Sequence, residues 1–159
     1  MGTRRRLVAM VTVVVALGSA APLAQAAAND CPTVFNGAIH YELVSVSCTG
    51  PICTIVFSGS GGSTLGPVTD TLRVVQNFAS TPCPTFTSEH TMSFAGSRTL
   101  TAVGEGTVCG NPGGNSFITE TSAVTGGTGG LENAIGTVFG EGVSGPTGPV
   151  VHFHGKLDC

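Results

Sequence analysis

The sequence contains no tryptophan and a single tyrosine, Tyr41, and only 9% of its 159 residues are charged. Proteins that bind carbohydrate or single-stranded nucleic acid stack their ligands on exposed aromatic rings, so this composition argues against both functions. The sequence also lacks a paired-carboxylate motif and the G-x-S-x-G motif of serine hydrolases. The nearest stretch, residues 59–63 (Gly-Ser-Gly-Gly-Ser), is expected to form a flexible loop. No motif for nucleophilic catalysis is present.

Basic residues are also scarce, and half of them lie at the amino terminus. Three arginines at 4–6 precede an apolar run over 7–17 and a stretch of small residues, an arrangement typical of a secretory signal peptide. The apolar run is too short to span a membrane stably. The adjacent arginines also fit twin-arginine export, but we favour the general secretory route because the run is strongly hydrophobic. We therefore predict a signal peptide at 1–28 and a secreted domain at 29–159.

Removal of the signal peptide leaves Arg73, Arg98 and Lys156 against nine carboxylates, a net charge of −6. Nucleic acids and anionic membranes are bound by clustered lysine and arginine, so we expect neither nucleic-acid binding nor stable membrane association. The remaining length of about 130 residues suffices for one hydrophobic core. The mature chain is predicted to be one acidic domain, and its sequence leaves the oligomeric state open.

All six cysteines lie in the mature part of the chain: Cys31, Cys48, Cys53, Cys83, Cys109 and Cys159. An even number of cysteines in an exported chain predicts disulfides, whereas zinc sites usually contain a C-x-x-C pair, which is absent. Cys48 and Cys53 bracket a Gly-Pro turn and are expected to pair. For the other four cysteines we expect Cys83 with Cys109 and Cys31 with Cys159, although six cysteines allow fifteen connectivities.

The mature chain divides into segments of alternating, β-branched and threonine-rich sequence that glycine, proline and serine separate. No window outside the signal peptide has a helical period. About eight such segments with short links predict an all-β domain, a single closed antiparallel barrel stapled by disulfides. A two-sheet β-sandwich is the alternative. The predicted strands are Ala38–Cys48, Cys53–Ser58, Val68–Phe78, Phe86–Phe94, Arg98–Cys109, Ser116–Thr125, Ala134–Val143 and Val150–Asp158.

A glycine-rich stretch near the carboxyl terminus predicts a sharp corner between two strands. Glycine tolerates positive φ, so Gly126, Gly127, Gly129 and Gly130 allow a tight turn. The spacing from Leu131 to Ala134 fits one loose helical turn that tucks both side chains under the corner. Phosphate loops need a lysine and a following helix, and neither is present. This stretch is therefore predicted to be structural.

The pattern Gly-Gly-Thr-Gly-x-Leu-x-x-Ala-x-Gly over Gly126–Gly136 resembles the G-G-T-G-x-F-x-x-A-x-G signature of the allene oxide cyclase and dirigent-protein superfamily. That superfamily consists of eight-stranded antiparallel β-barrels. The sequence departs from the signature at Leu131, where an aromatic residue is common, and in its six cysteines. The resemblance implies the barrel fold and an apolar cavity that steers a reactive intermediate.

Alternation along two predicted strands places polar residues among apolar ones that face inward. Asp70 and Gln76 share a face with Val68, Leu72, Val74 and Phe78; His90 and Ser88 share one with Phe86, Met92 and Phe94. In a functional interpretation, Asp70, Gln76 and His90 converge in an apolar cavity and orient a ligand, and a carboxylate beside an imidazole can move a proton. In a structural interpretation, Asp70 caps a loop at the barrel end while Gln76 and His90 satisfy buried backbone groups or each other. We favour the structural interpretation, and His90 is the strongest candidate for a site.

Three other histidines are weaker candidates. His152 and His154 share one face of a strand, a spacing found in metal sites, and His40 is a conceivable third ligand. Their neighbours Val151, Phe153 and Leu157 take the apolar face, so we expect both histidines to face solvent without metal. No cofactor is expected.

Three functions fit these observations. The first is a non-catalytic module that binds a small apolar ligand or a protein partner. The second is an enzyme like the cyclases and dirigent proteins, which shapes a reactive intermediate in its cavity. The third is an extracellular structural protein with a filled barrel. The first two need an internal cavity, and turnover of a ligand distinguishes one from the other.

Overall fold

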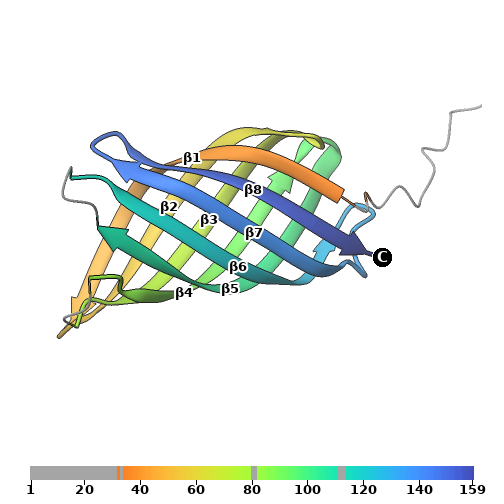
Figure 1. The fold of residues 1–159 in the computed structure, drawn as a ribbon. Helices are drawn as coiled ribbons and strands as arrows, with labels where there is room; N and C mark the ends of the chain where they lie inside the picture. The colour runs from red at the N-terminus through yellow and green to blue at the C-terminus, as the bar shows by residue number, and fades with distance from the viewer. Residues whose placement is uncertain (1–31, 33, 80–81, 111–113) are drawn as a thin grey trace, which may run out of the picture.

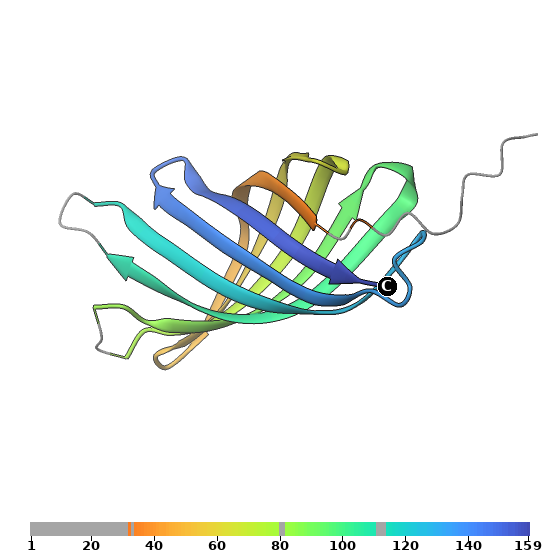
Figure 2. The same ribbon diagram turned by 45° about the vertical axis from the view of Figure 1, so that its right-hand side comes forward.

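The computed structural model describes residues 32, 34–79, 82–110 and 114–159. The predicted signal peptide and Cys31 lie outside these residues. Eight strands pair in sequence order, each antiparallel to the next, and pairing of the first strand with the last closes the barrel (Figures 1 and 2). The predicted closed barrel is therefore confirmed, and the alternative sandwich is wrong.

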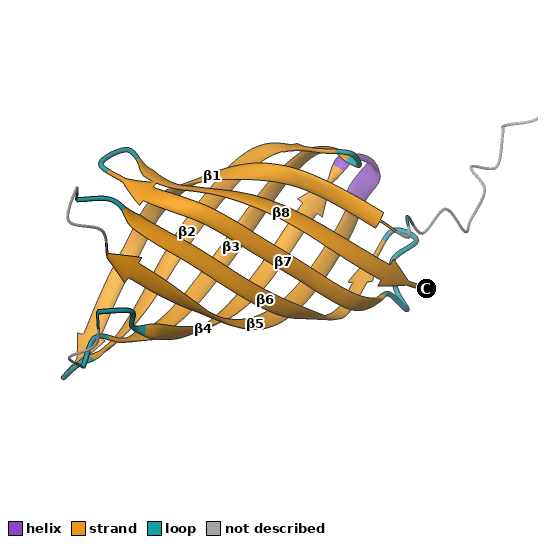
Figure 3. Cartoon of the chain, in the orientation of Figure 1, coloured by secondary structure: helices purple, strands orange, loops and turns teal. Residues whose placement is uncertain are grey.

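Each predicted segment corresponds to one strand. The described residues contain no α-helix, only a short 3₁₀ turn, η1, at Ala95–Ser97 (Figure 3). No helix among them has the length and apolar character needed to cross a membrane. The strands are β1 (Val34–Thr49), β2 (Ile52–Ser63), β3 (Gly66–Asn77), β4 (Thr85–Phe94), β5 (Arg98–Gly110), β6 (Ser116–Thr128), β7 (Ile135–Gly145) and β8 (Gly148–Asp158).

The predicted inward face of β3 and β4 is confirmed, with one exception. Buried and exposed residues alternate along both strands, and the polar residues at 70, 76, 88 and 90 are buried with their apolar neighbours. Phe78, predicted to face inward, is 51% exposed. It follows the last residue of β3, and its backbone N–H donates to the Pro51 carbonyl at 2.8 Å, so strand alternation no longer sets its direction.

The Ser/Gly stretch 59–63 is not the expected loop but the second half of β2, paired on both sides with β1 and β3. Glycine is needed there for space rather than flexibility. A Cβ at Gly59 would fall 2.5 Å from the Ile39 side chain and 2.6 Å from the Tyr41 ring. The missing side chain therefore makes room for two large inward-facing groups of β1.

Beyond its middle, β1 separates from β8. Pairing between these strands ends at His40 and Val150, whereas β1 and β2 stay paired to the turn at Thr49 and Ile52. In the sequence, Leu43 and Val44 break the apolar alternation that runs from Ile39 and Tyr41 to Val46, which predicts a bulge. The register of β1 shifts between Leu43 and Ser45, which confirms it. The β1–β2 hairpin consequently extends past β8, and residues 42–49 are all exposed.

The glycine-rich corner joins β6 to β7 and closes one end of the barrel. Gly126, Gly129 and Gly130 adopt positive φ, but Gly127 does not. Leu131 is only 1% exposed, as is Ala134. The Ala134 N–H donates to the Leu131 carbonyl at 3.0 Å, so the segment is a single hydrogen-bonded turn. Both side chains are tucked beneath the corner, as predicted.

Beneath this corner lies a fully buried part of the hydrophobic core. The Phe35 ring packs edge-on against Phe94, with centroids 6.1 Å apart, and is tilted against Phe153, with centroids 5.8 Å apart. Leu100 and Leu157, each 1% exposed, join the same cluster. This end, which we call the closed end, also contains η1, purple in Figure 3, and the carboxyl terminus (Figure 1). The other end contains the β1–β2, β3–β4, β5–β6 and β7–β8 connections, and we call it the mouth.

Two predicted disulfides are present, and both lie at the mouth. Cys48 pairs with Cys53 across the β1–β2 turn, and Cys83 pairs with Cys109, which ties the β3–β4 connection to the end of β5. The third expected pair includes Cys31, which is outside the described residues. Covalent links therefore hold the end of the barrel that has less packed core.

Truncation of the corner plug tests its contribution to stability. We expect Leu131→Ala to lower the free energy of unfolding by ~2 to 5 kcal/mol, because it opens a cavity under the corner. Ile135→Ala is the matched control, since Ile135 is 63% exposed nearby, and should cost far less. Urea denaturation of both variants makes the comparison. Equal losses would show that Leu131 does not plug the barrel.

Removal of each disulfide tests how the mouth is held. The loop between Cys83 and Cys109 spans 26 residues, and the loop between Cys48 and Cys53 spans 5. Closure of the longer loop removes more entropy from the unfolded chain, so the Cys83→Ser/Cys109→Ser variant should lose about 1.5 kcal/mol more than Cys48→Ser/Cys53→Ser. Urea denaturation under oxidising conditions measures the difference. A larger loss for the short loop would contradict this account.

Candidate functional site

A cavity of about 150 Å³ occupies the barrel between its centre and the mouth. Its wall is mainly apolar. Inward-facing residues toward the mouth, such as Ile55, Phe57, Val108 and Ile118, are half-buried, whereas those at the closed end are fully buried. The cavity therefore opens at the mouth. Its polar lining consists of Tyr41, Gln76, His90, Glu120, Ser122 and Ser144.

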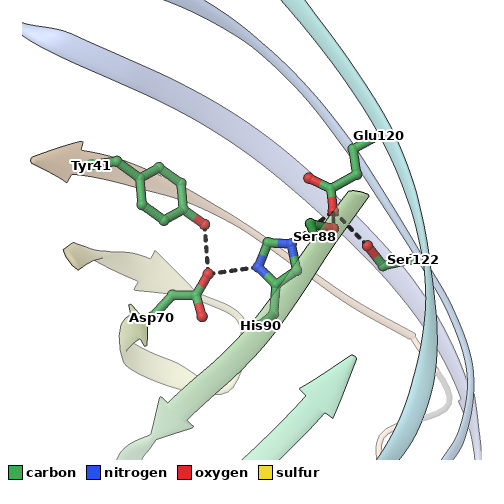
Figure 4. A network of polar contacts seen from close by, with 6 residues as sticks. All are labelled: Tyr41, Asp70, Ser88, His90, Glu120 and Ser122. Atoms are coloured by element: carbon green, nitrogen blue, oxygen red, sulfur yellow. Dashed lines mark hydrogen bonds and ion pairs between the residues drawn. The ribbon is translucent and has the colours of Figure 1, made fainter. Parts of the chain in front are cut away.

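At the inner end of the cavity, three side chains from different strands meet. The His90 Nδ1 atom lies 2.7 Å from the Asp70 Oδ2 atom, and the Tyr41 hydroxyl donates to the same oxygen at 2.7 Å (Figure 4). Strand pairing sets this arrangement, because His90 lies directly opposite Leu72, two residues from Asp70 on the same face of β3. All three residues are buried.

The other side of the His90 ring faces Glu120 on β6. The His90 Nε2 atom lies 2.8 Å from the Glu120 Oε1 atom, which also accepts hydrogen bonds from the hydroxyls of Ser88 and Ser122 (Figure 4). Gly104, on the strand between them, provides the room: a Cβ there would lie 2.1 Å from the Ser122 hydroxyl oxygen and 2.8 Å from Glu120 Oε1. The glycine is therefore part of the site's architecture.

The hydrogen-bond partners define the protonation of His90. Each ring nitrogen lies within hydrogen-bond distance of a carboxylate oxygen, and only an imidazolium, which donates from both nitrogens, satisfies both carboxylates at once. Burial disfavours this charge, but the hydrogen bonds to Asp70 and Glu120 and the attraction of both carboxylates outweigh it. Together they raise the pKa of His90 to about 10.

The pKa values of Glu120, a partner of His90, and of Tyr41, a partner of Asp70, shift in opposite directions. Burial raises the pKa of Glu120, but hydrogen bonds and charge attraction from His90, with hydrogen bonds from both serines, outweigh burial and lower it. Burial and the neighbouring Asp70 carboxylate raise the pKa of the Tyr41 hydroxyl well above its usual value. At neutral pH Tyr41 is therefore a neutral donor and Glu120 a carboxylate.

Three polar groups beside this network have no hydrogen-bond partner among the described residues. The Gln76 side chain, in a residue only 6% exposed, lines the cavity and makes no hydrogen bond there. The Asp70 Oδ1 atom is buried without a partner. The second carboxylate oxygen of Glu120 points away from His90 and both serines (Figure 4). Gln76 and Glu120 line the cavity and Asp70 does not, so the hydrogen-bonding capacity available to a ligand comes from the Gln76 amide and the second oxygen of Glu120.

The three candidate residues predicted from the sequence, Asp70, Gln76 and His90, are all buried in the barrel. Asp70 and His90 contact each other inside the barrel, so Asp70 does not cap a loop at the barrel end as the structural interpretation expected. Gln76 lines the same cavity but contacts neither of them through a hydrogen bond. Glu120 and Tyr41 were missed. The alternation of side chains along a strand could have predicted that both face inward. Glu120 shares a face with Ile118 and Val124, and Tyr41 shares one with Ile39.

The remaining histidines lie outside the barrel. His152 and His154 are exposed, as predicted, and the His154 ring stacks on Phe139 at a centroid distance of 5.2 Å. His40 hydrogen-bonds to the Thr147 carbonyl at 2.8 Å. Within the described part of the chain, no group of three or more histidine, cysteine, aspartate or glutamate side chains is arranged to hold a metal ion.

Comparisons of the chain with protein families, with curated proteins and with solved structures found no match. The interpretation of this site therefore comes from its own geometry.

The charge network predicts how stability depends on pH. The pKa of His90 is higher in the folded protein than in the unfolded chain, so its stabilisation is complete below about pH 6.5 and is lost as pH rises toward 10. The slope should be about 1 kcal/mol per pH unit between pH 7 and 10. Glu120 affects stability at acidic pH. Its pKa is lower in the folded protein than in the unfolded chain, so its stabilisation is lost as pH falls below about 4.5.

Urea denaturation at a series of pH values measures the loss of stability at alkaline and at acidic pH. The His90→Gln variant is compared with the wild type. The variant should lose the alkaline slope up to about pH 9, because glutamine does not titrate. A wild-type protein whose stability is unchanged between pH 7 and pH 9 would contradict the buried imidazolium.

Proposed function

We propose that the protein is a secreted, non-catalytic barrel that binds a small, mainly apolar ligand in its open-ended cavity. The observation that carries the proposal is the Gln76 side chain, which belongs to a residue only 6% exposed and lines an apolar cavity without a hydrogen-bond partner among the described residues. Ligand pockets combine an apolar wall with a few polar groups that orient the ligand. Gln76 and the free oxygen of Glu120 are suited to that role.

The hydrogen bonds around His90 favour binding over catalysis. Both of its ring nitrogens are held by carboxylates, so no face of the imidazolium is left to exchange a proton with a ligand. The lowered pKa of Glu120 makes it a weak base. The network therefore acts as a fixed charge at the inner end of the cavity.

The mouth provides an apolar route into the cavity. Leu43 lies opposite Phe57, and Val46 lies opposite Ile55, so all four share the concave face of the hairpin. Leu43 and Val46 are more than half exposed, because β8 does not extend alongside this part of β1. An apolar ligand longer than the cavity would rest on this surface. If the ligand is instead a protein partner, that partner would contact the same exposed surface.

One observation favours an enzyme as the second candidate. A continuous hydrogen-bonded chain runs from Tyr41 through Asp70 and His90 to Glu120 and ends at the cavity. The resemblance to allene oxide cyclases and dirigent proteins implies a cavity that steers a reactive intermediate, and a fixed carboxylate would stabilise positive charge in it. Turnover of the captured ligand is the discriminating measurement. The cavity itself argues against a structural protein with a filled barrel.

Secretion is part of the proposal. The two disulfides are compatible with an extracellular protein, since such bonds persist in oxidising compartments. The basic and apolar start of the sequence supports the same location.

Obstruction of the cavity tests the proposed function. Ile118 lines the cavity and the next residue, Thr119, is exposed on the outer face. We expect the neutral fluorescent probe N-phenyl-1-naphthylamine to bind the wild-type mature protein and Thr119→Trp, but to bind Ile118→Trp at least about tenfold more weakly. Fluorescence titration measures this, and far-UV circular dichroism verifies folding. Equal binding by both variants would place the probe outside the cavity and contradict the proposal.

A further inference from the structure

The polar network inside the barrel carries an uncompensated negative charge. The hydrogen bonds from His90 to Asp70 and Glu120, and the attraction of both carboxylates, hold His90 as an imidazolium, and it is the single cation between them. The Tyr41 hydroxyl is a neutral donor. Two negative charges and one positive charge leave a net charge of −1 in the interior.

No basic side chain of the described chain offsets this charge from another strand. Arg73 is exposed and pairs with Glu89 on the outer face at 3.4 Å. Arg98 binds the backbone carbonyls of Ala95 and Leu65 at the closed end, and Lys156 is exposed. The other described acidic groups, including Glu42, Glu89, Glu105, Glu141 and Asp158, are exposed and so do not face the cavity.

An unpaired charge in an apolar interior is unfavourable, and a ligand of opposite charge relieves that cost. The charge is also accessible to a ligand. Glu120 lines the cavity, its second oxygen has no hydrogen-bond partner among the described residues, and its side chain is 9% exposed. The anion therefore lies at the surface of the cavity rather than behind it.

Gln76 and Glu120 line the same cavity. Strand pairing connects them in one row across the barrel wall, from Gln76 to Phe86, then to Gly106 and to Glu120. The Phe86 ring leans over Gly106, where a Cβ would be only 2.4 Å from the ring. An aromatic surface thus lies between an amide and a carboxylate, and cations are attracted to all three groups.

We propose that the ligand of this cavity is an organic cation, a protonated amine on a small apolar body. This rests on the proposed function, which requires a ligand in the cavity but says nothing of its charge. The ammonium group donates to the free oxygen of Glu120, and the Gln76 amide oxygen accepts a further hydrogen bond. The apolar body packs against Val74, Phe86, Met92 and Val138, which line the cavity.

Three probes of nearly equal shape and different charge test the proposal: benzylammonium, benzyl alcohol and benzoate. Isothermal titration calorimetry at pH 7 with the mature, oxidised protein should give at least about tenfold tighter binding of benzylammonium than of benzyl alcohol, since charged hydrogen bonds are the stronger ones. Benzoate should bind most weakly. In Glu120→Gln the preference for the cation should fall to less than about threefold.

A second variant keeps the test decisive if Glu120→Gln does not fold. Gln76→Met retains the carboxylate and should keep the order of the three probes while it weakens benzylammonium. Equal binding of the ammonium and the alcohol by the wild type would overturn the cation proposal and leave the ligand-binding function standing. Binding of none of the three probes, together with no binding of N-phenyl-1-naphthylamine, would overturn both.

Discussion

The interior of the barrel depends on the imidazolium of His90 held between two carboxylates. This contact joins β4 to β3 through Asp70 and to β6 through Glu120, and Tyr41 extends it to β1. Each carboxylate makes the charged imidazole favourable, and the imidazolium in turn holds Glu120 ionised. A neutral histidine could donate to only one of them and would leave the other carboxylate buried without that partner.

This network divides the barrel into two parts with different physical support. On one side, phenylalanine and leucine side chains fill the closed end beneath Leu131. On the other side, the barrel holds a cavity, and its strand ends are tied by the Cys48–Cys53 and Cys83–Cys109 disulfides. Because cross-links constrain the unfolded chain, they stabilise a mouth that is not filled by side chains. An open pocket is thus compatible with a stable barrel.

Much of the fold is predictable from the sequence because strand alternation and glycine-rich turns are local signals. All eight strands, the Val44 bulge and the buried Leu131 follow from them. The Ser/Gly end of β2 was not predictable, because the space that Gly59 leaves is set by Ile39 and Tyr41 on the neighbouring strand. The site was predictable in part: alternation buried Asp70 and His90, but Glu120 joins them only through the register of β4, β5 and β6.

The central claim is that His90 carries a proton on both ring nitrogens between two ionised carboxylates. Neutron diffraction from deuterated crystals of the mature protein at pH 7 tests it most directly, because it locates the exchangeable hydrogens of the network. This account predicts deuterium on both Nδ1 and Nε2 of His90 and none on the oxygens of Asp70 and Glu120. Deuterium on a single ring nitrogen, with the other facing a protonated carboxyl group, would contradict it.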